Sequence, residues 1–271
     1  MKAEDAITVS TLINAVNTDG LGAAIDSALA PLIDYDMSCA YLFRATTPAV
    51  LIHNGYRHSV PESTLNAYLR GGYLLDPFYV ACMNDHPAGL WRMSDLAPDS
   101  FFSSGYSISK DIHPCVSSHH GTSIEEIGFI IPIRPQVAAV YSLMKGLENG
   151  GFQDDEMDAI AHLAPILNAL FELQYRPGQG EPQASAAPSS PGEDAFIQML
   201  QGQLTEAQSH IAKLILQGHS NASIADKLNI SEGTVKVHKH NIYQRLNIST
   251  HAELFRLFIS YLTGDSPGAS D

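Results

Sequence analysis

The chain is poor in cysteine, in basic side chains and in long hydrophobic runs. Its 271 residues include three cysteines, an odd number without a C-x-x-C pair, so Cys39, Cys82 and Cys115 are expected to be free thiols of a cytoplasmic protein. No apolar stretch approaches the roughly 20 residues of a membrane span. The amino terminus carries two acidic residues and no long apolar run, so a signal peptide is not expected there. A membrane partner is therefore not expected.

Motifs typical of catalysis are also lacking. The chain contains no G-x-S-x-G, no G-x-x-x-x-G-K-[ST] and no cysteine–histidine nucleophile context. No acidic cluster follows a first buried strand, so control by aspartyl phosphorylation is not expected. We predict that the protein is not an enzyme and uses no cofactor.

Basic side chains are scarce and unevenly distributed. The 15 Lys/Arg face 29 Asp/Glu, and the formal net charge of −14 by itself argues against a nucleic-acid partner. Residues 201–262, however, contain six Lys/Arg and four Asp/Glu, so this end carries +2 and the remainder −16. This asymmetry favours one DNA-binding end and one acidic domain that repels DNA. Because that end is only mildly basic, we expect binding to need two copies and contacts to specific bases.

A segment rich in Pro, Gly, Ser and Ala divides the chain. Residues 176–194 read RPGQGEPQASAAPSSPGED and contain almost no apolar bulk, which is typical of a flexible linker. A length of 271 residues favours two domains. We predict a ligand-sensing domain over residues 1–175 and a helical DNA-binding domain over residues 195–271.

The carboxy-terminal stretch from Leu204 to Leu262 shows four successive helical patterns. Each is preceded by a hydroxyl residue suited to an N-cap, namely Thr205, Ser220, Ser231 and Thr250. Two of these stand three residues before Gln208 and Glu253, the spacing of a capping box. Gly218 follows the first helical pattern, where a C-cap uses positive φ. The short Asn229-Ile230-Ser231 turn between the second and third patterns indicates a helix-turn-helix.

The third helical pattern, Ser231 to Leu246, has two different faces. Its inward face is predicted from three- and four-residue spacing to hold Val235, His238, Ile242 and Leu246. The other side carries polar groups that suit a DNA major groove, since Lys reaches phosphates or guanine and Gln pairs with adenine. That side holds Lys236, Lys239, His240 and Tyr243, with Gln244 and Arg245 further along. The alternative is a solvated surface helix.

At these residues the chain resembles the DNA-binding domain of LuxR/FixJ-type transcriptional regulators. The matching pattern is LTEAQ…I…L…G.SN..IA..L.IS.GTVKVH..NIY.RL.I, over about sixty residues. The resemblance implies a helix-turn-helix over residues 221–240. Ala207 and Gln208 replace the family's usual Arg-Glu pair, which weakens a surface charge pair. The residues expected to bind DNA are Ser220, Asn221, Thr234, Lys236, His238, Lys239, His240, Tyr243, Gln244 and Arg245.

The amino-terminal half is predicted to be an α/β sandwich on an antiparallel sheet, so the whole chain is of the α+β class. Its order is helix, two strands, an irregular middle with short helices, two strands and a long helix kinked at Pro165. This order resembles that of PAS- and GAF-like sensors. The predicted elements are a helix at 21–33, strands at 37–43 and 49–53, a short helix at 62–69, strands at 127–133 and 137–144, and a helix at 157–171.

The irregular middle, residues 71–123, and its flank concentrate aromatic side chains, with Asp76 among them. Aromatic walls with a single carboxylate suit a small-molecule pocket; the alternative is an ordinary aromatic core in which Asp76 turns the chain before Pro77. Acyl-homoserine-lactone receptors of the LuxR family have an Asp-Pro pair followed by Trp at the spacing of Asp76-Pro77 and Trp91. The family's further Trp and Tyr are missing, because Ser63 and Ala67 fall near their positions, although Tyr68 is one position away. The predicted ligand-binding residues are Tyr68, Tyr73, Asp76, Phe78, Trp91, Phe101 and Tyr106, and with Asp76 as anchor the hypothesis is an amine-bearing ligand.

A cluster of His113, Cys115, His119 and His120 contains good zinc ligands. Its spacing matches no structural zinc pattern, and adjacent histidines often point apart. No metal site is predicted.

These patterns together predict a cytoplasmic, ligand-responsive transcription regulator. We expect it to bind a palindromic double-stranded promoter site as a homodimer, to respond to a small-molecule effector and to work with RNA polymerase. The apolar residues of the last helical pattern are candidates for the dimer contact, namely Leu254, Phe255, Phe258 and Leu262. Two alternatives remain: an acyl-homoserine-lactone quorum-sensing receptor, and a protein-interaction module with secondary DNA binding.

Overall fold

The computed structural model describes residues 3–56, 60–107, 109, 114, 124–176, 200 and 202–263, and the chain packs into two compact units. The first unit comprises residues 1–59, 80–96 and 123–187, and the second comprises residues 60–79, 97–122 and 188–271. Of the predicted linker, residues 176–194, only Arg176 lies among the described residues. The domain limits at 175 and 195 stay a prediction.

Among the described residues, five strands form one antiparallel sheet in the first unit, in the order β2-β1-β5-β4-β3. The predicted α+β class is confirmed. Four strands match the predicted ones to within a few residues at each end. The strands are β1 (Met37–Arg44), β2 (Val50–Gly55), β3 (Gly89–Arg92), β4 (Ile124–Arg134) and β5 (Val137–Gly146).

Strand β3 was not predicted from the sequence. It is four residues long and half-buried, so it offers too few alternating positions to reveal a strand, and it pairs only with β4 at the edge of the sheet. Its Arg92 explains how so short a strand is held. The guanidinium contacts Glu125 on β4, donates to the Phe152 carbonyl at 2.9 Å and meets Asp154 at 2.8 Å.

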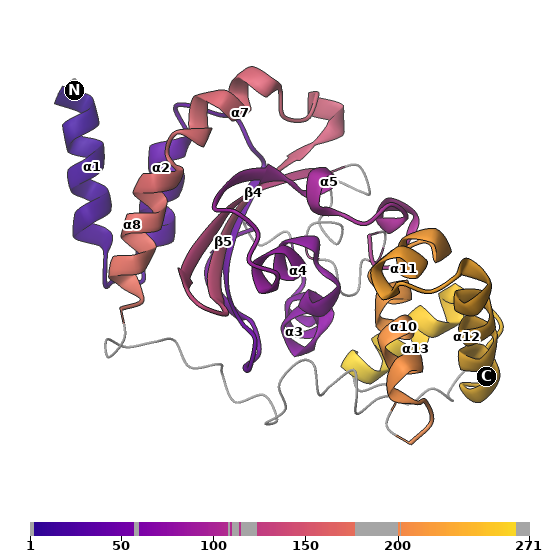
Figure 1. Cartoon of the computed structure of the whole chain (residues 1–271). Helices are drawn as coiled ribbons and strands as arrows, with labels where there is room; N and C mark the ends of the chain where they lie inside the picture. Colours follow the sequence, from indigo (N-terminus) through magenta and orange to yellow (C-terminus); the bar gives the residue numbers. More distant parts are fainter. Residues whose placement is uncertain are drawn as a thin grey trace. The chain divides into compact units, whose positions relative to one another are not determined.

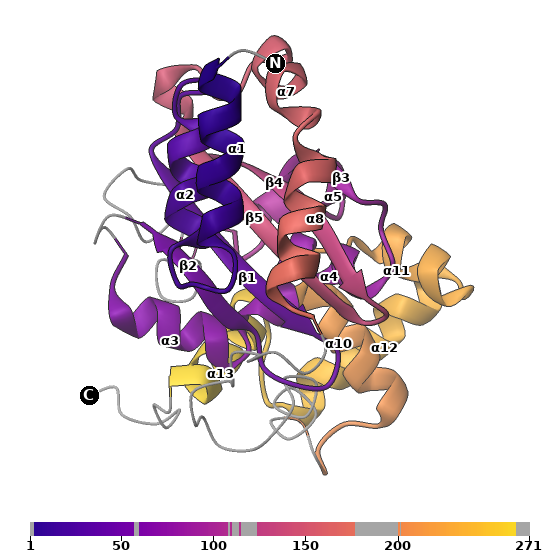
Figure 2. The ribbon, with the colours of Figure 1, turned by 90° about the vertical axis from the view of Figure 1, so that its left-hand side faces the viewer.

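One face of the sheet is covered by helices from both ends of the amino-terminal half. Helix α1 (Ala3–Ala15) packs on α2 (Leu21–Leu29), and α8 (Ala164–Gln174) runs beside them; α1, α2 and α8 stand in front of the strands in Figure 2. The core beneath them is apolar and close to fully buried. It includes Ile25 and Leu29 from α2, Ile127, Phe129, Ala139 and Leu143 from the sheet, and Leu167, Leu170 and Phe171 from α8.

Two helices differ from their predicted limits. Helix α2 ends at Leu29, followed by the C-cap Ala30, because Pro31 has no N–H with which to continue the helical hydrogen bonds. Leu32, predicted on the buried stripe, is consequently 46% exposed. The predicted single helix at 157–171 is two helices, α7 (Asp154–Ala161) and α8, and Pro165 lies in the first turn of α8 where its missing N–H costs nothing.

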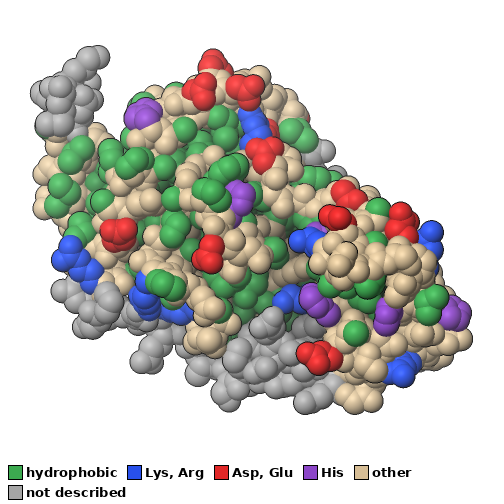
Figure 3. Space-filling model, viewed as in Figure 1, with side chains coloured by type: hydrophobic (Ala, Val, Ile, Leu, Met, Phe, Trp, Pro, Cys, Tyr) green, Lys and Arg blue, Asp and Glu red, His purple; other side chains and the backbone are tan. Residues whose placement is uncertain are grey.

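Helix α7 precedes this break. It has three acidic residues in its first turn, where negative charge interacts favourably with the positive end of the helix dipole. The acidic side chains over α7 are visible in Figure 3. Short elements complete the first unit or adjoin it. These are α4 (Pro77–Met83), which reaches into both units, α5 (Met93–Leu96) and the 3-10 turn η3 (Leu147–Asn149).

A polar network fixes α2 to the sheet within this apolar face. The Asp26 carboxylate lies 2.8 Å from Nε2 of His53 and accepts from the hydroxyls of Tyr141 at 2.7 Å and Ser38 at 2.9 Å. Burial by itself would raise the pKa of Asp26, but the hydrogen bonds from His53, Tyr141 and Ser38 outweigh it and hold that pKa below its usual value. A Cβ at Gly22 would lie 2.3 Å from the His53 ring, so glycine permits this close approach of helix and strand.

The second unit is helical in its described part. Before the linker it contains α3 (Glu62–Arg70) and the 3-10 turns η1 (Gly72–Leu75) and η2 (Phe101–Ser103). After the linker it contains α10 (Glu206–Leu216), α11 (Asn221–Leu228), α12 (Glu232–Arg245) and α13 (His251–Thr263), all drawn in orange to yellow in Figure 1. Within this unit, Arg70 donates to the Leu262 carbonyl at 3.0 Å, and Gln217 donates to the Leu74 carbonyl at 3.0 Å.

We predict that Asp26→Asn lowers the free energy of unfolding by about 1–3 kcal/mol at neutral pH, because it leaves buried donors on the sheet without their carboxylate. Since the folded-state pKa of Asp26 is depressed, its contribution is present above the unfolded pKa and is lost as the pH falls through the folded one. Urea unfolding at pH 7 and at pH 3 measures both effects. The matched control is Asp34→Asn at an exposed position, and equal losses in the two variants would contradict the prediction.

Candidate functional site

The carboxy-terminal helices begin where the sequence predicted, and each start is set by a hydroxyl cap. Thr205 and Gln208 form the predicted capping box at α10. The Ser220 hydroxyl accepts from the Ser223 amide at 3.2 Å, and the Ser231 hydroxyl accepts from the Thr234 amide at 3.0 Å. Gly218 has a φ of 91°, as expected for the residue that ends the turn after α10. The caps therefore fix the start of each helix in this module.

The turn between α11 and α12 sets the angle of α12. Asn229 adopts the left-handed conformation with φ 52°, which Asn tolerates better than most residues. The Ile230 amide then donates back to the Ala225 carbonyl at 3.0 Å. A small core locks this geometry, with Ile224, Val235 and Ile242 all 0% exposed. The predicted helix-turn-helix geometry is present.

The open face of α12 holds a subset of the predicted DNA-binding residues. Lys236 is 64% exposed and lies 3.8 Å from Glu232, one turn earlier on the same helix. Thr234, His240 and Gln244 are also exposed. At 100° per residue, His240 and Gln244 lie opposite the buried Val235 and Ile242. The exposed face therefore carries one cation, two polar side chains and one hydroxyl group that can contact a binding partner.

Other predicted DNA-binding residues pack toward the module. His238 and Tyr243 are half-buried, and burial raises the pKa of Tyr243 to about 12. The Lys239 ammonium lies 5.7 Å from the centre of the Tyr243 ring, a cation–π contact. Arg245 donates to the Gln208 side chain at 2.9 Å and so ties α12 to α10. These residues position the helix, while its open face is left to others.

Sequence reasoning missed Val237. This side chain is 59% exposed on the open face of α12. Apolar side chains contact the methyl group of thymine in a major groove. The available signal was its position: Val237 is apolar but lies off the inward stripe that includes Val235 and Ile242.

The predicted ligand cluster is partly assembled around Asp76, within the second unit. The Tyr68 hydroxyl donates to Asp76 Oδ2 at 2.6 Å, and the Phe78 amide donates to Oδ1 at 2.8 Å. The Tyr73 ring meets Tyr68 and Tyr79 edge-on, with centroids 6.3 and 4.9 Å away. Burial raises the pKa of Asp76 to about 6 in spite of these hydrogen bonds. Both carboxylate oxygens are therefore already bonded within the chain.

The remaining predicted ligand residues lie elsewhere. Phe101 and Tyr106 are buried in the second unit with ring centroids 5.8 Å apart. Trp91 belongs to the first unit, where its ring meets His86 edge-on at 4.4 Å and its indole N–H donates to the Pro87 carbonyl at 3.0 Å. The structure thus brings Tyr68, Tyr73, Asp76 and Phe78 together and gives Trp91 a local role.

Three further expectations meet the structure as follows. His113, Cys115, His119 and His120 lie outside the described residues. Cys39 and Cys82 are buried, and neither forms a disulfide in the described part of the chain. The helices in the described part of the chain are all too short or too polar to cross a membrane.

Residues 202–258 match the family described as "Bacterial regulatory proteins, luxR family". This module is a LuxR-family helix-turn-helix domain. An HTH-type transcriptional regulator in the exeN 3′ region of Aeromonas salmonicida is 28% identical over 198 residues, which cover 69% of this chain and 94% of that protein. The response regulator TmoT of Ectopseudomonas mendocina is 41% identical over 54 residues, only 20% of this chain and 24% of that protein.

The fold of the chain also has a solved counterpart. The VqsR LBD domain from Pseudomonas aeruginosa superimposes with a TM-score of 0.52 at 18% identity, covering 64% of this chain and 97% of that domain. This likeness supports the α+β fold. The LuxR-family match itself rests on the carboxy-terminal residues 202–258.

The LuxR-family domain has one of its helix starts occupied by an acid. The amide of Ser220, the N-cap of α11, donates to Asp99 Oδ1 at 2.9 Å within the second unit. Hydrogen bonds from the Ser220 side chain and amide hold the pKa of Asp99 below its usual value. Helix starts of this kind bind phosphate through the same amides. Asp99 therefore lies where a phosphate contact by Ser220 or Asn221 is expected.

We predict that Asp76→Asn removes a pH dependence of stability between about pH 4 and pH 6. In the wild type the folded-state pKa of about 6 exceeds the ordinary 3.8, so the protonated acid favours folding and the free energy of unfolding falls as the pH rises through this window. The amide variant cannot titrate. Urea unfolding at half-unit pH steps measures the slope, and Asp34→Asn serves as a control that retains it. A slope unchanged in Asp76→Asn would disprove the assignment to Asp76.

Proposed function

We propose that this protein is a cytoplasmic transcription regulator whose LuxR-family domain binds promoter DNA. The observation that carries the proposal is the open face of α12, on which Lys236, Val237, His240 and Gln244 project from a helix that caps and a buried core hold in place. A cation, an apolar group and two hydrogen-bonding groups on one helix face suit the phosphates and base edges of a major groove.

The regulator acts as a homodimer on a roughly palindromic site. A domain with only a +2 balance over residues 201–262 gains little from non-specific attraction, so doubling the contacts by two-fold symmetry supplies affinity. The apolar residues of α13 do not provide the dimer surface that the sequence suggested. Leu254, Phe255, Phe258 and Leu262 are 0–7% exposed because they pack within the second unit.

A small molecule bound by the amino-terminal half controls the regulator, which acts on RNA polymerase at the promoter. The support is the α+β sensor-like fold, its likeness to the VqsR LBD domain and the aromatic cluster around Asp76. The acyl-lactone alternative gains no support from the cluster, because the small residues Ser63 and Ala67 remain where aromatic groups would be needed.

Lys236→Ala should weaken DNA binding and reduce the salt dependence of the affinity by about one unit of log K against log salt for a lost phosphate contact. The probe is a duplex that the full-length wild-type protein selects from a random-sequence pool, followed by fluorescence anisotropy at several salt concentrations. Arg256→Ala removes one exposed charge from α13 instead of α12 and should leave the slope unchanged. Failure of the wild type to enrich any duplex would refute DNA binding and favour the protein-contact alternative.

Asp99→Asn should tighten binding to the same duplex by about two- to tenfold, because a carboxylate on the Ser220 amide competes with phosphate and repels it. Asp95→Asn, an exposed acid with the same loss of charge, controls for net charge and should change affinity less. If both variants gain equally, the effect is one of net charge alone and the local competition is wrong.

A further inference from the structure

The first unit contains a cavity that none of the predicted ligand residues lines. It has a volume of about 270 Å³, is partly open to solvent and lies between strands β1 and β2, the start of α2 and the end of α8. That size is close to the lower end of the roughly 300–1,000 Å³ typical of ligand pockets, so a small organic molecule would fill it. Its lining consists of Thr18, Asp19, Leu21, Gly22, Ala40, Leu51, Ile52, His53, Phe171, Gln174 and Tyr175.

The walls of the cavity are held in place by bonds within the chain. The Gln174 side chain accepts from the Asn17 amide and donates to the Thr18 carbonyl at 3.5 Å, which ties the loop between α1 and α2 to α8. His53 is committed to Asp26. The residues around the opening are thus preorganised, and a ligand would not have to order them.

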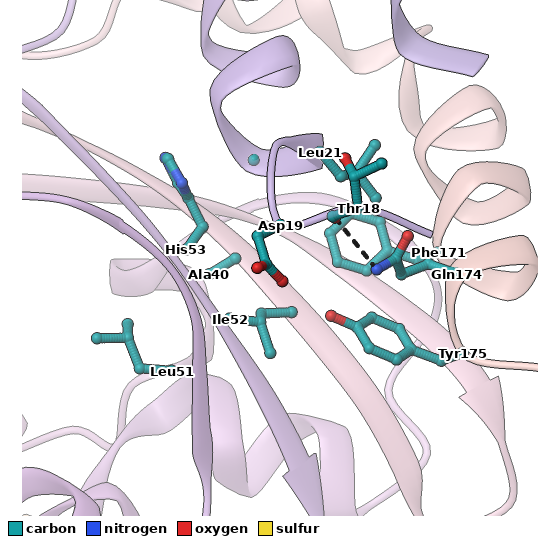
Figure 4. Close-up of a pocket in the computed structure, with 11 residues that line it drawn as sticks. Thr18, Asp19, Leu21, Ala40, Leu51, Ile52, His53, Phe171, Gln174 and Tyr175 are labelled. Carbon is teal, nitrogen blue, oxygen red and sulfur yellow. Dashed lines mark hydrogen bonds between the residues drawn. The ribbon is translucent and has the colours of Figure 1, made fainter. Parts of the chain in front are cut away.

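Two polar groups in the cavity have no such commitment. Figure 4 shows the Asp19 carboxylate and the Tyr175 hydroxyl directed into the same space. Neither group makes a side-chain hydrogen bond to another residue in the described part of the chain. Burial raises the pKa of Tyr175 to about 12; the charge of Arg44 opposes this and that of Asp19 adds to it, consistent with a carboxylate close to the phenol. An acceptor charge and a phenol oxygen therefore share one cavity with open hydrogen-bonding capacity.

The rest of the lining is suited to an apolar body. Leu21, Ile52 and Phe171 contribute aliphatic and aromatic surface next to the Asp19 carboxylate, and no Lys or Arg is among the lining residues. The exposed Asp19 carboxylate attracts a cationic group, and aromatic faces add to this attraction. An anionic ligand would meet the like charge of Asp19.

The comparison with Asp76 decides between two candidate anchors for an amine. Asp76 already accepts hydrogen bonds from Tyr68 and from the Phe78 amide, so a ligand would have to displace one of them. Asp19 is exposed at the mouth of a cavity and has no bond to lose.

We propose that the cavity between β1, β2, α2 and α8 binds a small organic amine, its ammonium group on Asp19 and Tyr175 and its apolar body against Ile52 and Phe171. This proposal rests on the sensory function proposed above and moves the amine from Asp76 to the α2–α8 face of the sheet. Binding can be measured without DNA, so its failure is separate from failure of the DNA-binding function.

The test is isothermal titration of the full-length protein with 2-phenylethylamine and n-hexylamine, and with 2-phenylethanol and phenylacetate as neutral and anionic counterparts. Both amines should bind, the alcohol at least about tenfold more weakly, and phenylacetate not measurably, because only the ammonium forms a charge-assisted bond. Equal binding of amine and alcohol would overturn the proposal. So would the absence of binding of either amine at about 10 mM, a concentration at which even weakly bound fragments are detected.

Three variants locate the site. Asp19→Asn lies in an exposed loop and should weaken amine binding by about tenfold while leaving the affinity for the alcohol unchanged. Asp34→Asn, an exposed acid outside the cavity lining, and Asp76→Asn should bind amines like the wild type. Loss of binding in Asp76→Asn with retention in Asp19→Asn would place the amine at Asp76 and refute the assignment to this cavity. Matching unfolding curves for Asp19→Asn and the wild type exclude a folding defect.

Discussion

The burial of the central strands β1 and β5 is the constraint on which the first unit depends. Both strands are buried along almost their whole length, so each of their faces must be covered by other parts of the chain. On one face α2 and α8 supply that cover with an apolar core. At the end where the α1–α2 loop meets the end of α8, the cover is incomplete, and the cavity beside Asp19 lies there. A gap in the cover of a well-packed sheet is a natural place for a ligand, because the walls are rigid for other reasons.

Two acids, Asp26 and Asp76, show how placement decides the state of a carboxylate. Burial raises the pKa of each, and each accepts a hydrogen bond from a tyrosine. In Asp26 the bonds from His53, Tyr141 and Ser38 outweigh burial, so the acid stays charged and pins helix to sheet. In Asp76 burial outweighs the hydrogen bonds from Tyr68 and the backbone, and the pKa rises to about 6. The first is a structural anchor, and the second is poised near neutrality.

In the LuxR-family domain, some residues of α12 fix the helix to the rest of the module and others remain exposed on its open face. The basic or polar side chains of Arg245, Tyr243 and Lys239 pack against neighbouring residues of the module. The open face of α12 keeps fewer groups than its sequence suggests. In the proposed function these few groups leave affinity to two-fold repetition and base contacts, which agrees with the weak positive balance of residues 201–262.

The sequence by itself determined the elements whose signals are local. The hydroxyl caps, Gly218 and the Asn229 turn predicted all four carboxy-terminal helices, since capping and turn conformations depend on neighbours within a few residues. Short apolar runs bounded by turn residues predicted four of the five described strands for the same reason. The short strand β3 was not predicted, because four residues give too short a pattern.

Only the tertiary structure decided which side chains meet. His53 reaches Asp26 across 27 residues and Tyr141 reaches it across 115, because strand pairing and helix packing bring them together. The same packing satisfied Asp76 locally, turned Trp91 toward His86, exposed Val237 and left Asp19 open beside a cavity. Sequence spacing identified an acid among aromatic residues, but the bonds that an acid has left to offer depend on its neighbours in space.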